Sequence, residues 1–344
     1  MFYRVSSLIY NNFMFNNKKL GAFIVPTGVG ASIGGFAGDA SPYAREFSKH
    51  CQLIVNPNVV NAGGFSGIND NMFYVEGYSL DEFFKGNLKL TPSRDNKIGI
   101  IFDKGIPEHI LNVHLNTMNA VKAVYGVDIP FYELTQEPVG VKFVMEESGI
   151  STGTLANPQT LLKAAKSLLA KGADALAIVC MFENPTEENP DYQNGLGVDP
   201  VGGVEAIISH YISKELKVPC AHSPAFDDLE ITTELIDGKS ASEYITPTFL
   251  PCILLGLSNA PKLNQNTGVG IEDLDFLVMP YNCLGSTPVF ECVKRGIPVY
   301  AIEENKTILD VTKQKIFPTT NGITLVKSYR DLLEKMPGST GFYN

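Results

Sequence analysis

The residues most suited to acid–base chemistry are cysteines and a histidine at the ends of short apolar runs. Cys180 closes the apolar run 174–181, Cys283 closes another such run, and His222 follows residues 220–221. A thiol beside a helix start has a lowered pKa, and an imidazole titrates near neutrality. Two thiols facing across a cleft could remove and return a proton at a carbon beside a carboxylate. We therefore predict Cys180, Cys283 and His222 as catalytic residues, with burial in the core as the alternative for both thiols.

A glycine-rich turn, residues 27–35, follows the first predicted strand. Glycines allow positive φ and bring backbone amides close to an anion near the start of a helix. The spacing is G-x-G-x-x-x-G-G, with Ile33 where a dinucleotide fingerprint has its third glycine, and no Gly-Lys-Ser/Thr follows as in a P-loop. Asn56 stands where a ribose-binding carboxylate would follow the second strand. The pattern disfavours a nicotinamide cofactor and leaves an anion-binding loop or a plain turn.

Polar turns also follow other predicted strands. The segment 197–203 could be an anion loop, a hinge or a plain turn before a helix. The turn 282–287 could hold a carboxylate or phosphate, or could only cap its helix. Because the carboxyl ends of parallel strands meet at one edge of a sheet, we expect these turns to surround one site. The predicted ligand-binding residues are Thr27, Gly28, Gly30, Gly34, Gly35, Asn56, Asn58, Asn61, Asp103, Asp199, Gly202, Gly203, Asn282, Gly285, Ser286, Thr287 and Glu303.

Composition excludes several classes of protein. The chain has 344 residues and a net charge of -10 without a basic stripe, which argues against a nucleic-acid partner. Its six cysteines show no CxxC spacing, so neither a disulfide framework nor a structural zinc site is expected, and we predict no metal and no cofactor. The apolar stretches 21–38 and 245–257 contain glycine or proline or are too short to span a bilayer. We predict a cytoplasmic protein without a membrane partner, and homo-oligomerisation stays open.

The elements that must position these residues alternate along the chain. Apolar runs typical of buried strands are each followed by an amphipathic segment, which predicts crossover connections and a parallel sheet. We expect an α/β fold of mostly parallel, doubly wound sheets, arranged as two Rossmann-like lobes with a cleft between them. The predicted division is a leader at 1–20, an N-terminal lobe at 21–150 and a C-terminal lobe at 151–344. The predicted helices are 41–50, 107–125, 161–171, 204–216 and 288–294, and the predicted strands are 22–26, 52–55, 97–102, 174–181, 220–222 and 299–303.

Nearly the whole chain resembles a family of uncharacterised proteins of about this length, found mainly in photosynthetic bacteria. The stretches that carry the resemblance are VPTGVGASIGGFAGDASPYA, NPNVVNAGGFSG, YVEGYSLDEFF, GVDPVGGVEAIISH and TFLPC. They are long and specific. The family has no assigned activity, so this resemblance predicts a relationship and not a reaction.

Two local resemblances suggest reactions. The stretch LLKAAKSLLAKGADALAIVC resembles a segment of the aspartate/glutamate racemase superfamily, which would make Cys180 one proton-transfer cysteine and Cys283 the other. Met181-Phe182 stand where that family has Asn-Thr. The stretch NCLGSTPVFECVKRGIPVYAIEEN instead resembles the donor-binding segment of two-domain glycosyltransferases, in which Glu291 would help to hold a nucleotide sugar.

Three functions follow from these observations. The first is a small-molecule enzyme that binds an anionic metabolite at the glycine-rich turns, as a cofactor-independent racemase or isomerase with cysteine acid–base chemistry. The second is a nucleotide-sugar or phosphometabolite transferase that uses the same turns. The third is a non-catalytic regulatory protein that binds a metabolite.

Overall fold

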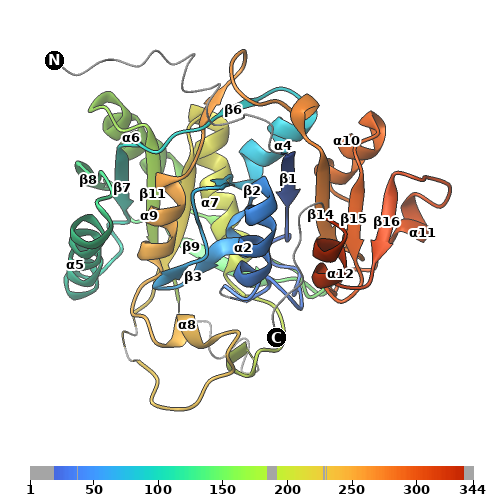
Figure 1. Cartoon of the computed structure of the whole chain (residues 1–344). Coiled ribbons are helices and arrows are strands. Elements are labelled where there is room, and N and C mark those ends of the chain that lie inside the picture. Colours follow the sequence, from blue (N-terminus) through green and yellow to red (C-terminus); the bar gives the residue numbers. More distant parts are fainter. Residues whose placement is uncertain (1–18, 37, 184–191, 228, 230, 337–344) are drawn as a thin grey trace.

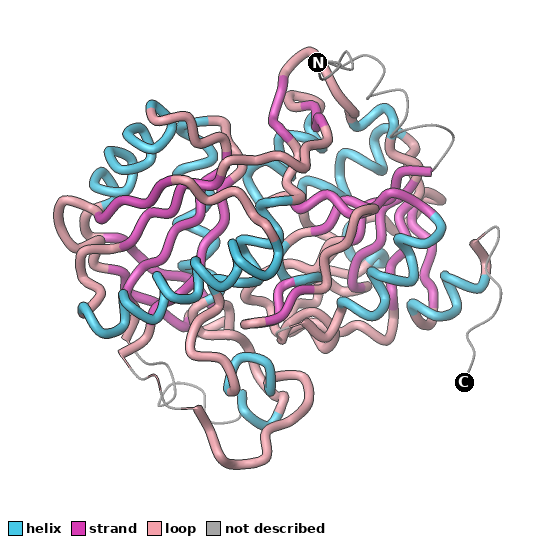
Figure 2. Tube along the Cα trace, turned by 60° about the vertical axis from the view of Figure 1, so that its left-hand side comes forward, coloured by secondary structure: helices cyan, strands magenta, loops and turns pink. Residues whose placement is uncertain are grey.

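The computed structural model describes residues 19–36, 38–183, 192–227, 229 and 231–336. Its main strands form two separate parallel sheets, one of six strands and one of four, with helices packed around and between them (Figures 1 and 2). The predicted α/β fold with mostly parallel sheets is confirmed.

The six-stranded sheet has the order β16-β15-β14-β1-β2-β5, and all neighbours in it are parallel. Its first strand along the chain, β1, lies in the middle, so strand order reverses between β1 and β14, as in a dinucleotide-binding fold. The central strands are almost fully apolar because both faces of the sheet are covered. The strands are β1 (Lys19–Phe23), β2 (Cys51–Val55), β5 (Met72–Tyr74), β14 (Phe276–Pro280), β15 (Val299–Ile302) and β16 (Ile323–Val326).

The four-stranded sheet has the order β12-β11-β7-β8, and it is also parallel throughout. Its longest strand is β11, whose first six residues are all buried. The strands are β7 (Ile98–Phe102), β8 (Phe131–Leu134), β11 (Ala175–Met181) and β12 (Cys220–Ala225).

The two sheets divide the chain differently from the predicted lobes. The six-stranded sheet takes its strands from residues 19–74 and 276–326, whereas the four-stranded sheet takes its strands from residues 98–225. The predicted boundary at residue 150 therefore falls between strands of one sheet and does not separate the two sheets.

Helices cover both sheets, and α7 and α9 lie between them (Figure 1). Helix α7 packs on β12 of the four-stranded sheet. It also packs on α4, the helix that follows β5 of the six-stranded sheet. The helices against the six-stranded sheet are α2 (Ser41–His50), α4 (Gly77–Lys85), α10 (Thr287–Arg295) and α12 (Tyr329–Glu334). Those around the four-stranded sheet are α5 (Glu108–Tyr125), α6 (Pro158–Ala170), α7 (Gly202–Leu216) and α9 (Leu250–Ser258).

Shorter elements complete the described chain. Two-stranded antiparallel pairs are formed by β3 (Asn61–Ala62) with β4 (Phe65–Ser66), β6 (Lys89–Thr91) with β13 (Lys262–Asn264), and β9 (Val141–Met145) with β10 (Ser151–Leu155). Single turns of helix are α3 (Pro57–Val60), α8 (Ala241–Tyr244), α11 (Lys313–Ile316), η2 (Tyr192–Asn194) and η3 (Ile271–Asp273).

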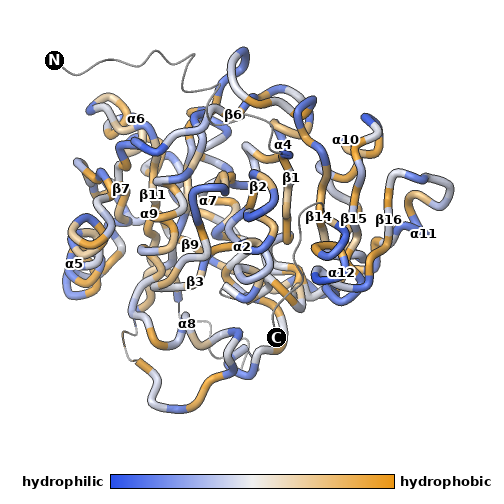
Figure 3. Tube along the Cα trace, viewed as in Figure 1, coloured by the Kyte–Doolittle hydropathy of each residue, from blue (hydrophilic) through white to orange (hydrophobic). Residues whose placement is uncertain are grey.

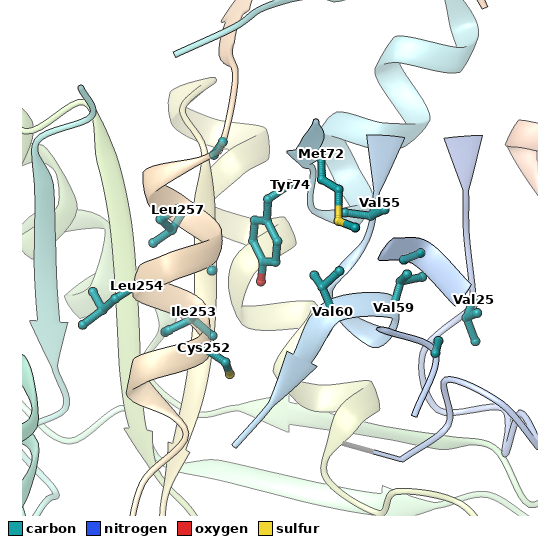
Figure 4. Close-up of a cluster of buried hydrophobic side chains, with 14 of the residues drawn as sticks. Val25, Val55, Val59, Val60, Met72, Tyr74, Cys252, Ile253, Leu254 and Leu257 are labelled. Atoms are coloured by element: carbon teal, nitrogen blue, oxygen red, sulfur yellow. The ribbon is translucent and has the colours of Figure 1, made fainter. Parts of the chain in front are cut away.

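One hydrophobic core joins the two sheets through α9. The α9 side chains Cys252, Ile253 and Leu257 lie opposite Tyr74 and Val60 from the β2–β5 region (Figure 4). Hydrophobic residues are concentrated in the strands and in α9 (Figure 3). The apolar stretch 245–257 of the sequence is therefore mostly this core helix. In the described part of the chain, no helix combines the length and apolar character needed to cross a membrane.

Candidate functional site

A cavity of about 90 Å³ lies between the glycine-rich turn and the residues that link the two sheets. Its walls come from the β1–α2 connection, residues 57–63, the start of α7, strand β12, and α8 and α9. Ten of the predicted site residues line it: Thr27, Gly28, Gly30, Gly34, Gly35, Asn58, Asn61, Asp199, Gly202 and His222. Residues far apart in sequence thus meet in the wall of this cavity.

The glycine-rich turn is held in shape by Asp39. The backbone of Gly34 has φ +85, a left-handed conformation that glycine adopts without strain, and its amide donates to Asp39 Oδ1 at 2.7 Å. Burial raises the pKa of Asp39 to about 6, although the amides that it accepts and Lys239 nearby oppose the rise. Gly28 and Gly30 have no side chain, so they line the cavity with backbone atoms.

The other side of this turn faces β14 and is filled by protein. Ile33 donates its amide to Asn305 Oδ1 at 3.1 Å, and the amide of Ser32 donates to the carbonyl of Lys306 at 2.7 Å. The cavity therefore lies on the side of the turn that faces the four-stranded sheet and not at the β1–β14 reversal.

The turn that follows β14 packs against the same loop, residues 305–309, that contacts Ile33 and Ser32. Asn282 donates to the carbonyls of Thr307 and Leu309 at 2.9 and 2.6 Å, which ties two loops together. None of the predicted residues Asn282, Gly285, Ser286, Thr287 and Glu303 lines the cavity. Glu291, the residue suggested by the glycosyltransferase resemblance, is paired with Arg295 on α10.

Two further predicted residues, Asn56 and Asp103, have structural roles outside the cavity lining. Asn56 accepts from the amide of Val25 at 3.0 Å and donates to its carbonyl at 2.7 Å, which joins the ends of β1 and β2. Asp103 is 1% exposed and accepts three backbone amides, from Gly105, Val139 and Met181.

Gly203 allows a close approach of α7 to β10. Its amide donates to the hydroxyl of Ser151 at 3.0 Å, and an added Cβ would lie 1.9 Å from the Ser151 carbonyl oxygen. Only glycine fits there, so the first turn of α7 can pack directly against the Ser151 backbone.

The two predicted catalytic cysteines are not brought together. Cys180 is buried in the core beside α6 and α7, whereas Cys283 is buried in a different cluster against the six-stranded sheet. Burial raises the pKa of the Cys180 thiol well above its ordinary value and that of Cys283 to about 12. Neither lines the cavity, where Cys252 of α9 is the cysteine present. Burial thus favours the protonated form of both thiols, which makes them poorly suited to acid–base catalysis.

Three carboxyl groups meet in the cavity wall: Asp199, Glu205 and Glu243, here called the acidic cluster. Burial raises the pKa of all three, that of Glu243 to about 8 and that of Glu205 well above its ordinary value. Neighbouring negative charges in the cluster add to this effect on Glu205. Burial therefore favours the protonated form of all three carboxyl groups in the acidic cluster.

His222 lines the cavity from within β12, and a chain of hydrogen bonds reaches it from the protein interior. Its Nδ1 lies 2.9 Å from the hydroxyl of Ser209, which donates to Glu76 at 3.1 Å. Tyr74 also donates to Glu76, at 3.0 Å. This network fixes the orientation of the imidazole ring through its Nδ1 atom.

The electrostatics of His222 keep it neutral. Burial and the charge of His210 lower the pKa of His222 to about 3, while burial raises the pKa of Glu76 to about 8 despite the two hydroxyls that donate to it. A neutral imidazole in the cavity wall is thus linked through Ser209 to a buried carboxyl group, Glu76, that lies outside the cavity lining.

No lysine or arginine is found among the described residues that line the cavity. Lys239 is close, but its ammonium donates to the carbonyl of Ser32 at 3.2 Å. Within the described ranges, no three His, Cys, Asp or Glu residues are grouped so that they could hold a metal ion.

Sequence reasoning missed Glu243, Tyr192 and Cys252. Glu205 had a signal, since it follows the paired glycines 202–203 at a helix start, but Glu243 lies in a segment without periodicity. Only the folded chain brings Glu243 to the cavity, where it is hydrogen-bonded to Tyr192.

The fold and site together define a two-sheet α/β protein with a small polar cavity between the sheets. Residues 21–335 match the family described as "Protein of unknown function (DUF3326)", and the chain belongs to this family. It is similar to a protein of Synechococcus sp. named "Uncharacterized lipoprotein", with 38% identity over 306 residues that cover 87% of this chain and 85% of the relative. The predicted relationship to a family from photosynthetic bacteria is confirmed. No solved structure matches the chain significantly.

Proposed function

We propose that this protein is an enzyme that moves a proton on a small polar metabolite, as a cofactor-independent isomerase or racemase. The feature that supports this best is the presence, in one cavity wall, of His222, whose pKa burial lowers, and Glu205, whose pKa burial raises. Titratable groups whose surroundings push their pKa values in opposite directions are typical of an acid and a base in an active site.

The proposed step conserves atoms and charge. His222 Nε2 takes a proton from a carbon of the substrate, and the electron pair left there is drawn toward an adjacent carbonyl or carboxyl group. The Glu205 carboxyl group delivers its own proton to the substrate, at the other face or at a neighbouring atom. The product has the composition of the substrate, and the enzyme returns to its first state when the imidazolium loses a proton to water and the carboxylate gains one.

The remaining residues of the site support these two. Ser209 and Glu76 are positioning residues, because Ser209 contacts the Nδ1 atom of the imidazole ring and is itself held by Glu76. The amides of the glycine-rich turn can stabilise negative charge that develops on the substrate.

The test is solvent exchange on a pool of small metabolites. The protein is incubated in heavy water with amino acids, hydroxy acids and sugar phosphates, and carbon-bound deuterium is read by mass spectrometry. We expect incorporation into one compound class, its loss in His222→Ala and Glu205→Gln, and its retention in Cys283→Ala. No incorporation into any compound, or undiminished incorporation in His222→Ala, contradicts the proposal. Ligand-induced stabilisation without any incorporation supports a regulatory protein instead.

We also propose a cytoplasmic location, because all six cysteines are free thiols, as is usual in a reducing compartment. The name of the Synechococcus relative points to a membrane-anchored alternative. Fractionation of cells that express the tagged full chain separates the two, since recovery in the membrane pellet contradicts the cytoplasmic proposal.

A further inference from the structure

Glu76 is a buried carboxyl group with a hydroxyl group at each of its two oxygen atoms. It is 6% exposed and lies outside the cavity lining. The Tyr74 hydroxyl lies 3.0 Å from Oε1 of Glu76, and the Ser209 hydroxyl lies 3.1 Å from Oε2. Ser209 is also 2.9 Å from the Nδ1 atom of His222, which lines the cavity. A chain of three side chains therefore joins the buried carboxyl group to the cavity wall.

The Tyr74 hydroxyl determines which oxygen of Glu76 can carry a proton. A phenol has one hydrogen to donate, and that of Tyr74 goes to Oε1 of Glu76. The oxygen of the same hydroxyl accepts from Nδ2 of Asn61 at 3.2 Å. Because Oε1 already receives a donor, a proton added to Glu76 belongs on Oε2. That is the oxygen that faces Ser209.

The Ser209 hydroxyl has a single hydrogen, so it can donate to Glu76 or to His222 but not to both. When Glu76 is ionised, this hydrogen points to Oε2, and the Ser209 oxygen accepts from the Nδ1–H group of His222. When Glu76 is protonated, Oε2 donates to the Ser209 oxygen, and the Ser209 hydrogen turns to Nδ1. A neutral imidazole carries one hydrogen. In the second state that hydrogen is therefore on Nε2.

The surroundings of Glu76 contain no positive charge that would keep it ionised. The titratable or hydroxyl side chains that interact with it or pack beside it are Tyr74 from β5, Glu205, Ser209 and His210 from α7, and Cys220 and His222 from β12. Burial lowers the pKa of both histidines and raises that of the cysteine. Burial also raises the pKa of Glu76 to about 8, so both of its states are reached in an ordinary pH range.

We propose, building on the function proposed above, that the proton on Glu76 sets the tautomer of His222 through Ser209. Within the described ranges, Nδ1 is the nitrogen of this ring that has a hydrogen-bond partner, so the tautomer decides what Nε2 offers to a ligand. With Glu76 ionised, Nε2 is bare and can take a proton from a substrate carbon. With Glu76 protonated, Nε2 carries a hydrogen and acts only as a donor. A carboxyl group outside the cavity thus switches the chemistry of a side chain inside it.

Nitrogen NMR of the wild-type chain with isotope-labelled histidine tests the inference without a ligand. Long-range correlations to the ring protons distinguish a nitrogen that carries a hydrogen from a bare one. The chain has five histidines. The signals of His222 are assigned by their loss in His222→Gln, or by elimination through substitution of the other four.

We expect mostly the Nε2–H tautomer of His222 well below pH 8 and mostly the Nδ1–H tautomer well above it. The ratio of the two should change by up to about tenfold per pH unit around the pKa of Glu76. A ratio that is the same at every pH overturns the inference. That result is expected if the Ser209 hydrogen stays on the carbonyl of Ala206, which lies 3.3 Å away.

Glu76→Gln imitates the protonated carboxyl group permanently. Its side-chain oxygen can accept from Tyr74 while its amide group donates to Ser209. We expect the Nε2–H tautomer of His222 at every pH in this variant. Glu215→Gln, an exposed position on α7, is the control and should titrate as the wild type does. A folded Glu76→Gln variant with the Nδ1–H tautomer contradicts the inference.

Ser209→Ala tests the route of the coupling. The variant removes the hydroxyl that joins Glu76 to His222, so the tautomer ratio should no longer follow pH as it does in the wild type. Circular dichroism establishes that the variant is folded. A tautomer ratio that still changes with pH in folded Ser209→Ala shows that the coupling does not pass through this hydroxyl and overturns the inference.

The two proposals fail in different ways. A pH-dependent tautomer without deuterium incorporation into any metabolite sinks the enzymatic proposal and leaves the coupling of Glu76 to His222 standing. Deuterium incorporation that depends on His222, with a tautomer that does not change with pH, sinks the coupling and leaves the enzymatic proposal standing.

Discussion

The Nδ1 atom of His222 lies 2.9 Å from the hydroxyl oxygen of Ser209. Ser209 is fully buried on α7, so a side chain in a strand of one sheet is fixed by a helix that also packs against α4 of the other. The Ser209 hydroxyl in turn donates a hydrogen bond to Glu76, the second residue after β5. The orientation of His222 therefore depends on the way the two halves of the molecule pack together.

Removing the Ser209 hydroxyl should impair the reaction more than ligand binding. Ser209→Ala removes the contact that orients the imidazole ring, so we expect kcat to fall by about 10- to 100-fold with KM nearly unchanged. The pH profile of kcat should also shift, because Glu76 loses a donor. Steady-state kinetics with the exchanging metabolite measures both effects.

The control for this variant lies one turn further along α7. Ser213 is also fully buried, and its hydroxyl has no hydrogen-bond partner among the described residues. Ser213→Ala should leave kcat and its pH profile unchanged. Equal losses in the two variants would indicate a packing effect and remove the positioning role from Ser209.

The buried acids make stability depend on pH in an unusual direction. The pKa of Glu243 is about 8 in the folded chain, well above the ordinary value of 4.5, so the folded state binds more protons than the unfolded state between these values. The stability contributed by the protonated form is present below pH 4.5 and is lost as pH rises toward 8. The slope is at most about 1.4 kcal/mol per pH unit for one group.

Glu243→Gln isolates this contribution. The amide can still accept from Tyr192 but does not titrate, so we expect the variant to gain stability over the wild type progressively from about pH 5 to about pH 9. Urea unfolding at several pH values measures the difference. A difference that does not change with pH would show that the pKa of Glu243 is not raised in the folded chain.

Asn56 and Asn58 were both predicted as ligand-binding residues, and the structure gives them different tasks. Asn56 holds the backbone of Val25 through two buried hydrogen bonds, whereas Asn58 lines the cavity and accepts from Thr27. Asn56→Ala should lower the free energy of unfolding by about 2–3 kcal/mol, because the amide and carbonyl of Val25 are left unpaired.

Asn58→Ala is the comparison and should cost about 1 kcal/mol or less while weakening ligand binding. Denaturant unfolding gives both stabilities, and calorimetry gives the affinities. A large loss of stability in Asn58→Ala with none in Asn56→Ala would reverse these assignments.

The sequence predicted the local elements better than the composition of the site. Helix α2 covers 41–50 as expected, and β11 falls within the predicted strand 174–181, because amphipathic and continuous apolar patterns report burial directly. The glycine-rich turn was found for a similar reason, since its backbone conformation leaves a signature in the residues themselves.

The acidic cluster could not be predicted, because its members meet only through tertiary packing. Glu243 lies in a short helical turn without a buried residue, and its role depends on where α8 is placed beside α7. Likewise, the apolar run before Cys283 predicts a strand, but it does not predict that another loop occupies the space beside the turn that follows this strand. The loop at residues 305–309 fills it by bonding to Asn282 and Ile33.

The six cysteines give the last prediction. All are buried, and burial raises the pKa of Cys180 and Cys283, so thiolate is scarce at neutral pH. We expect a thiol-reactive disulfide reagent to modify the native chain very slowly and to modify six thiols once denaturant is added. Cys283→Ala should keep deuterium exchange while losing about 1–3 kcal/mol of stability to the cavity that it creates. If a folded Cys283→Ala variant loses exchange, the reaction depends on a thiol, and the acid–base pair proposed for His222 and Glu205 is contradicted.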